Sequence, residues 1–301
     1  MIDKAIAGGP TWLRGLLRLM SEAMVVEGRV DPARAPWRPF LAAVSVLAVI
    51  GLLGLAATSY VALRTSSGVG LDARLLDAVS STTPAHYQLH SDLRGSARWS
   101  ILLLALAGAL PALVRPRLGL WLGAGIVITG ANVAAQVLQH DVFTRPGVSP
   151  GTNGLPSQHM TVAFSLALAA VVVAPSAWRS MMSIGVSAAA TLVGLALVLG
   201  RWHRPSDVVA AIFLCMAWAG PGLLVAGLVR RRPLTPASST LTLVGGLIGA
   251  WTVSLVLVWR GARPPPGLPD LWLAIISLGS IGLACAIGVA AVARVADRHL
   301  G

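Results

Sequence analysis

Long apolar stretches dominate the pattern of residues along this chain, and short polar segments separate them. Eight of the stretches come near bilayer length, which is about 20 residues for a helix. They cover residues 39–63, 99–114, 118–139, 159–175, 181–200, 207–229, 241–259 and 271–293. The pattern predicts an all-α, polytopic membrane helix bundle with about eight transmembrane helices. It leaves no room for a soluble domain, because the longest gap is about 35 residues, from Arg64 to Arg98.

The first 36 residues differ from a signal peptide, because they lack a compact apolar core and a small-residue cleavage site. From Pro10 onward the apolar residues fall near one helical face and the charged residues fall elsewhere. The apolar set is Trp12, Leu13, Leu16, Leu17, Met20 and Met24. We therefore predict a cytoplasmic N-terminal segment, residues 1–36, with an amphipathic helix at the membrane surface. A helix that binds a protein partner would show the same pattern.

Composition supports the membrane interpretation and excludes other classes. Of 301 residues, 55% are hydrophobic and 11% are charged, against roughly 25% charged in a soluble domain. Such a chain is too apolar for a disordered protein. The net charge of +12 comes mostly from arginines between apolar stretches, which indicates membrane topology and anionic lipid headgroups rather than nucleic acid. Cys215 and Cys285 lie inside apolar stretches and give no disulfide or metal spacing.

The distribution of basic residues predicts the orientation in the membrane. With a cytoplasmic N-terminus, the inside segments hold 14 of the 23 lysine and arginine residues. This excess favours both termini inside, and it places the loops around 140–158 and 201–206 on the outer face.

Two polar stretches carry most of the ionisable residues near membrane depth, where such residues are costly and mark functional sites. The first runs from Gln139 to Pro146 and continues from Asn153 to His159, and the second runs from Gly200 to Asp207. Both lie at the predicted outward ends of apolar stretches, so the topology brings them to one face. Apart from His140 and Asp141, the stretches hold two histidines, an aspartate and three arginines, which at one membrane surface indicate anion chemistry with phosphate. We interpret His140 and Asp141 as ordinary loop residues.

These stretches resemble the type 2 phosphatidic acid phosphatases, the PAP2 or acid phosphatase–vanadium haloperoxidase superfamily. Three motif fragments occur in the family's order: Arg145-Pro146, then Pro156-Ser157-Gln158-His159, then His203 with Asp207 four residues later. The run from Trp202 to Val208 is similar to a form found in actinobacterial members. This form, together with the arginine-, alanine-, glycine- and valine-rich composition, implies an integral protein of a bacterial plasma membrane. The resemblance covers roughly residues 118–229. It divides the chain into the N-terminal segment, a PAP2-like membrane core at 37–230, and two additional helices with a short C-terminal tail at 231–301.

The resemblance implies a chemical role for each matched residue. His203 would be the nucleophile that forms a phosphohistidine, Asp207 would hold the His203 ring, and His159 would protonate the leaving group and then activate water. The phosphate-binding residues would be Arg145, Ser157, Gln158, Arg201 and Arg204. The scheme needs no metal and no cofactor. It implies a membrane phosphatase that hydrolyses a phosphomonoester or pyrophosphate of an isoprenoid or phosphatidyl lipid at the outer face. The expected partners are a lipid phosphate substrate and membrane lipids, without nucleic acid.

Three positions depart from the family pattern. The motif lysine falls on Leu138, the third-motif arginine falls on Leu197, and Gln158 stands at the usual glycine. These departures leave a second interpretation open, a weakened or inactive PAP2-like protein that binds or transports lipid phosphates. A structural membrane subunit with an accidental match is the third interpretation. The 64–98 segment is predicted to be a loop over the outer mouth of the site.

Overall fold

The computed structural model describes residues 37–79, 84–114, 117–145, 153–229 and 268–300, together with positions 244 and 248. The chain divides into two compact units, residues 1–36 and 37–301. The first unit, with its predicted amphipathic helix, lies outside the described residues. So does the predicted helix 241–259, except for the two helical positions 244 and 248.

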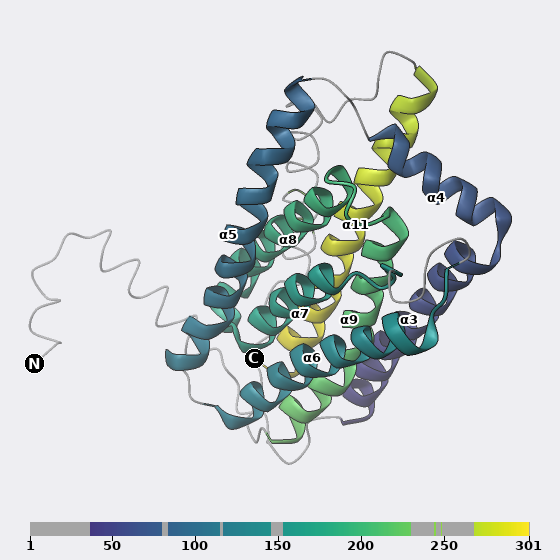
Figure 1. The fold of residues 1–301 in the computed structure, drawn as a ribbon. Helices are drawn as coiled ribbons and strands as arrows, with labels where there is room; N and C mark the ends of the chain where they lie inside the picture. The colour runs from purple at the N-terminus through teal and green to yellow at the C-terminus, as the bar shows by residue number, and fades with distance from the viewer. Residues whose placement is uncertain are drawn as a thin grey trace, which may run out of the picture. The chain divides into compact units, whose positions relative to one another are not determined.

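Helices make up the elements described in the second unit (Figure 1). They are α3 (Trp37–Arg64), α4 (Ser66–Ala78), α5 (Pro84–Val114), α6 (Leu118–Val137), the π-helix η2 (Leu138–Val142), α7 (Gln158–Val173), α8 (Ser176–Leu199), α9 (Pro205–Leu228) and α11 (Leu268–His299). The prediction of an all-α chain is confirmed.

Five of these helices are long and apolar enough to cross a membrane: α3, α6 with η2, α8, α9 and α11. Two further helices contain shorter apolar segments, Ala97–Leu110 in α5 and Gln158–Val173 in α7. Each predicted apolar stretch other than 241–259 falls on one of these helices. The protein is therefore a polytopic helical membrane protein, as its sequence pattern predicts.

The prediction of a loop at 64–98 is wrong, because this segment forms α4 and the first half of α5. Thr65 caps α4, and its hydroxyl oxygen accepts the N–H of Gly68 at 3.0 Å. The helix then buries Gly68, Asp72 and Ala78 on one side. Threonine before a helical pattern is a readable start signal, but the scattered polar residues of α4 obscured it.

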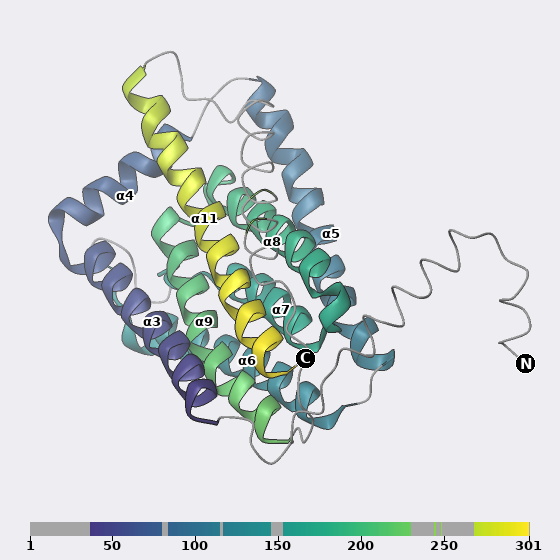
Figure 2. The same cartoon turned by 180° about the vertical axis from the view of Figure 1, so that it is seen from behind.

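The short helix α7 is the most enclosed element of the bundle. It contacts α5, α6, α8 and α9, and nearly all of its residues from Met160 to Val173 are buried. A helix that is apolar on every side belongs inside a protein. Around it, α3 packs against α9, while α11 packs against both α8 and α9, as Figure 2 shows from behind.

Small residues allow the helices around α9 to approach closely. A Cβ atom on Gly51 of α3 would lie 2.3 Å from the backbone nitrogen of Ala217. A Cβ atom on Gly123 of α6 would lie 2.5 Å from the carbonyl oxygen of Gly222. Close backbone contact at small residues is a common way to join helices within a membrane. It fixes α9, which begins at the candidate site, against two neighbours.

A buried ion pair joins the C-terminal helix to the rest of the bundle. Arg179 at the start of α8 donates to the carboxylate of Asp297 near the end of α11, and both side chains are 1% exposed. Arg179 also donates to the carbonyl oxygens of Val171 at 3.1 Å and Ala174 at 2.8 Å. One guanidinium therefore links the end of α7, the start of α8 and the end of α11.

Candidate active site

The two polar stretches meet at one end of the bundle, where α7 and α9 begin. The N–H of Ser157 donates to the carbonyl oxygen of Asp207 at 3.0 Å. The ring centroids of His159 and His203 lie 6.0 Å apart, with their planes inclined by 60°. These contacts bring together two segments about 44 residues apart in sequence. The prediction that both stretches reach one face is confirmed.

The turn after α8 presents His203 to this site. Past the C-cap Gly200, the N–H of Arg201 donates to the carbonyl of Val198 at 2.9 Å, and that of Trp202 donates to Leu197 at 3.0 Å. This pair of bonds is the Schellman motif, which requires a left-handed residue after the cap. Arg201 adopts that conformation with φ of 55°, although glycine is the usual residue there.

Asp207 lies in the first turn of α9 and faces His203. Its Oδ2 atom accepts the N–H of Arg204 at 3.0 Å, which caps the helix. The same oxygen lies 3.6 Å from Nδ1 of His203, whose side chain is 11% exposed. That nitrogen is buried and has no hydrogen-bond partner. A small movement would close the gap, and catalytic hydrogen bonds are often long before substrate binds.

Ser157 begins α7 as its N-cap. Its hydroxyl oxygen accepts the N–H of Met160 at 3.3 Å, and the N–H of Thr161 donates to the Ser157 carbonyl at 2.9 Å. The first amide groups of a helix have no carbonyl partner within the helix. Those of Gln158 and His159 therefore stand at the open end of α7, where a helix N-terminus favours an anion. The buried Nε2 of Gln158 has no hydrogen-bond partner either.

Arg145 lies between two carboxylates. Its Nη2 donates to Oδ1 of Asp207 at 2.7 Å, and its Nη1 lies 3.7 Å from Oδ2 of Asp72. The residue is 8% exposed, and its Nε is buried without a hydrogen-bond partner. The guanidinium is therefore compensated by protein carboxylates. Phosphate binding by Arg145 stays a prediction. A phosphate would have to compete with Asp72 and Asp207 for the guanidinium.

Asp72 of α4 is a site residue that sequence reasoning missed. It accepts the N–H of Ser206 at 3.1 Å and the Ser206 hydroxyl at 2.7 Å. Burial raises the pKa of Asp72 above its ordinary value, although the two bonds from Ser206 act in the opposite direction. The sequence did contain one indication of its role. The chain holds only 11 acidic residues, and any acid near an apolar stretch is a functional candidate.

Hydrogen bonds fix the conformation of the first polar stretch in its described residues, 139–145 and 153–159. The side chain of Gln139 donates to the carbonyl oxygen of Asn153 at 2.6 Å, and Nδ2 of Asn153 donates to that of Phe143 at 3.0 Å. His140 is exposed and bonds the carbonyl oxygen of Gln136 at 2.9 Å. His140 and Asp141 belong to the π-helix η2 rather than to a loop. Single π-turns inside helices often occur near functional sites.

The positions of the two missing cations are apolar. Leu138 packs partly buried against a cluster that contains Leu155 and Ala135. Leu197 is 2% exposed and belongs to the main core. Neither position offers a charge to a phosphate, so the remaining cations must supply it.

Arg201 and Arg204 flank His203. Arg201 is 52% exposed at its side chain and pairs with Asp77 of α4 at 3.1 Å. Arg204 is half-buried, and within the described ranges its side chain forms no ion pair. Both remain candidates for phosphate binding. Arg204 is the less constrained of the two.

Gly154 packs closely against the histidine–aspartate pair. A Cβ atom on this residue would lie 2.8 Å from Oδ2 of Asp207 and 3.1 Å from Nδ1 of His203. Only a residue without a side chain fits against the pair in this arrangement.

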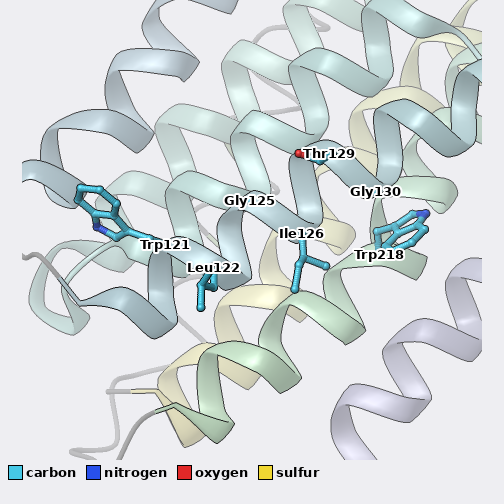
Figure 3. A pocket seen from close by; sticks show the side chains of 7 residues that line it. All are labelled: Trp121, Leu122, Gly125, Ile126, Thr129, Gly130 and Trp218. Carbon is cyan, nitrogen blue, oxygen red and sulfur yellow. The ribbon is translucent and has the colours of Figure 1, made fainter.

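An apolar groove of about 370 Å³ lies along α6 and α9 (Figure 3). It is lined by Trp121, Leu122, Gly125, Ile126, Thr129, Gly130 and Trp218. These residues include no ionisable group. The groove therefore does not compete with the histidine site as the place of anion chemistry.

Within the described ranges, no group of three or more histidine, cysteine or acidic side chains could hold a metal ion. Cys215 and Cys285 are buried and free. The expectation of a reaction without metal or cofactor stays a prediction.

A scan against protein-family models matches residues 133–231 to the PAP2 superfamily. A search of the curated proteins and a search of the solved structures found no match. The matched residues begin in α6 and pass the end of α9, so they include both polar stretches and both histidines of the site. They make up about a third of the chain. The family match agrees with the order of the three motif fragments, and the segment 133–231 is similar to the PAP2 superfamily.

Proposed function

We propose that the protein is a membrane lipid-phosphate phosphatase. It hydrolyses a phosphomonoester or pyrophosphate of an isoprenoid or phosphatidyl lipid at the outer face of a bacterial plasma membrane. The observation that carries this proposal is the separation of 6.0 Å between the rings of His159 and His203, with Asp207 behind His203. This distance puts both rings within reach of a single phosphoryl group.

The first half-reaction transfers the phosphoryl group to the protein. Because Nδ1 of His203 faces Asp207, Nε2 is the nitrogen available for attack on phosphorus. The Nε2–P bond forms as the P–O bond to the lipid breaks, and His159 donates a proton to the departing oxygen. Asp207 stabilises the positive charge that develops on the His203 ring.

The second half-reaction restores the protein. The now neutral His159 takes a proton from water as the water oxygen attacks phosphorus, and the P–Nε2 bond breaks. Inorganic phosphate leaves, while His203 returns to its neutral form and His159 to its protonated form. With a pyrophosphate substrate, the leaving group of the first step is the lipid monophosphate.

Anion binding in this scheme depends on donors at the start of α7 and on the flanking arginines. The N–H groups of Gln158 and His159 supply donors at a helix N-terminus, and the free Nε2 of Gln158 adds another. Arg204, next to His203 in the sequence, supplies a charge that no described carboxylate compensates. Such donors stabilise the equatorial oxygens in the transition state.

A second candidate function is binding or transport of lipid phosphates without turnover. The specific observation in its favour is that Leu138 and Leu197 are packed in apolar clusters, while Arg145 is shared by two carboxylates. Loss of a cation from a phosphoryl-transfer site costs about 2–4 kcal/mol of transition-state stabilisation. Turnover would then be slow even where binding persists.

The test is phosphate release by the purified protein in detergent, with a panel of lipid phosphates and with EDTA present. The His203→Ala variant is compared with the wild type, and acid-labile radioactive phosphate on the protein reports the phosphohistidine. We expect release and labelling by the wild type and neither by the variant. Folded wild-type protein that binds lipid phosphate but releases none would favour the second function.

His140→Ala is the matched control for this experiment. His140 lies in the first polar stretch, but it is exposed and bonds only the backbone of Gln136 among its described contacts. The control should therefore keep wild-type release. Equal loss of activity in both variants would contradict a specific role for His203.

A further inference from the structure

Asp72 occupies an unusual position for an acid in a membrane protein. It lies on α4, outside the segment that matches the family, and it is 5% exposed. Its two oxygens accept the backbone N–H and the hydroxyl of Ser206, in the first turn of α9. Oδ2 also lies 3.7 Å from Nη1 of Arg145.

A chain of charged groups runs from Asp72 to the candidate nucleophile. Arg145 uses Nη1 toward Asp72 and Nη2 toward Oδ1 of Asp207. The other oxygen of Asp207, Oδ2, accepts the N–H of Arg204 and faces Nδ1 of His203. The two oxygens of Asp207 therefore have separate tasks, one toward the arginine and one toward the histidine.

This division depends on how Arg145 is held. An arginine beside one carboxylate favours a bidentate pair that occupies both oxygens. Here the second terminal nitrogen faces Asp72, so Arg145 takes only Oδ1 of Asp207. Without Asp72, Nη1 would be free to compete for Oδ2, the oxygen that His203 needs.

We infer that Asp72 is a positioning residue that keeps Oδ2 of Asp207 available to His203 by occupying the second terminal nitrogen of Arg145. The inference rests on the proposed phosphatase function for its kinetic consequences. Asp72 touches no reacting atom in this scheme. It acts through Arg145 and Asp207 on the orientation and tautomer of the His203 ring.

A purely structural role is the competing explanation, because Asp72 also fastens the start of α9 through Ser206. Both roles predict some loss of stability when the carboxylate is removed. They differ at His203, since only positioning changes which ring nitrogen carries the proton. They also differ in the kinetics, because only positioning makes the effects of Asp72 and Asp207 interdependent.

The first measurement is spectroscopic and needs no turnover. The ¹⁵N shifts of the His203 ring, assigned by their absence in His203→Gln, report which nitrogen is protonated in the full-length protein in micelles. We expect the Nδ1–H tautomer to predominate in the wild type and to lose at least half of its population in Asp72→Asn. An unchanged tautomer in the folded variant would overturn the inference, whether or not the wild type is a phosphatase.

The second measurement is a double-mutant cycle on steady-state turnover. Asp72→Asn should lower kcat about tenfold and leave KM within twofold, the pattern of a lost transition-state interaction. In an Asp207→Asn background, the same substitution should lower kcat less than twofold. Fully multiplicative effects would overturn the inference. A wild type without turnover would instead refute the proposed function, and the tautomer measurement would still decide the role of Asp72.

Asp297→Asn is the matched control. Asp297 is a buried acid paired with an arginine, as Asp72 is, but it lies near the start of α8, at the other end of that helix from His203. This control should lower stability and leave both the tautomer and kcat unchanged. If it moved them as much as Asp72→Asn does, general loosening would explain both variants and the inference would fail.

Discussion

Gly154→Ala is the smallest change that disturbs the histidine–aspartate pair directly. The added Cβ atom would lie 2.8 Å from Oδ2 of Asp207 and 3.1 Å from Nδ1 of His203, whereas ordinary contact begins at 3.4 Å. The backbone of Gly154 lies outside the left-handed region, so alanine brings no conformational strain of its own. The substitution therefore tests the geometry of the pair and leaves its chemical groups intact.

The distances set the expected size of the effect. Restoring ordinary contact requires a displacement of about 0.6 Å between the Cβ atom and the carboxylate. Asp207 resists, because Oδ1 is held by Arg145 at 2.7 Å and Oδ2 by the N–H of Arg204 at 3.0 Å. A misplacement of 1 Å in a catalytic group costs about 10²-fold in rate. We therefore expect kcat to fall about tenfold, which corresponds to roughly 1.4 kcal/mol.

The assay is initial-rate phosphate release from the best lipid substrate, with thermal unfolding measured on the same preparation. Gly185→Ala is the control, because a Cβ atom there meets no atom within 4 Å. It should keep wild-type kcat. Gly154→Ala with wild-type kcat and an unchanged unfolding temperature would refute the reasoning, since the pair would then tolerate the crowding or have no part in turnover.

Three further predictions concern stability. Burial raises the pKa of Asp72, so its stabilising contribution is full below the ordinary aspartate value of about 3.9 and is lost as pH rises through the raised value. Over that window the unfolding temperature of the wild type should fall relative to that of Asp72→Asn, and parallel curves would contradict this. Arg201→Gly should raise the free energy of unfolding by about 1 kcal/mol, because it relieves the left-handed conformation; denaturant titration measures this, and a loss of stability would contradict it. Leu197→Arg should destabilise the protein by about 3 kcal/mol or more, since it buries an unpaired charge in the core; a variant with wild-type unfolding temperature would show that the position is open to water.

Local patterns in the sequence were sufficient for the helices and for the central residues of the site. Apolar runs of bilayer length predicted α3, α6, α8, α9 and α11. A membrane helix must pair its backbone N–H and C=O groups with each other and present apolar side chains to the lipid. The i,i+4 spacing of His203 and Asp207 placed them beside each other without any tertiary information. Their meeting with His159 followed from topology alone.

The contacts of Arg145 could not be predicted from the sequence, because they depend on burial and on a helix that is distant in the sequence. Asp72 lies 134 positions from Ser206, to which it bonds, and no local pattern links the two. The prediction that 64–98 is a loop removed Asp72 from consideration, since a loop residue has no fixed neighbours. Gly154 was visible in the sequence, but its role depends on a contact with Asp207 that only coordinates reveal.

The buried pair of Arg179 and Asp297 has a consequence for the order in which the protein is made. The two residues are separated by 118 positions, and synthesis proceeds at about 5–20 residues per second, so about 6–24 seconds pass between them. During that interval α8 enters the membrane with a guanidinium whose carboxylate does not yet exist. The ion pair between α8 and α11 therefore forms only after α11 has been synthesised. A chain shortened before Asp297 would lack the carboxylate that Arg179 binds, and the cell's quality-control proteases would encounter an incompletely assembled protein even though every residue of the site is present.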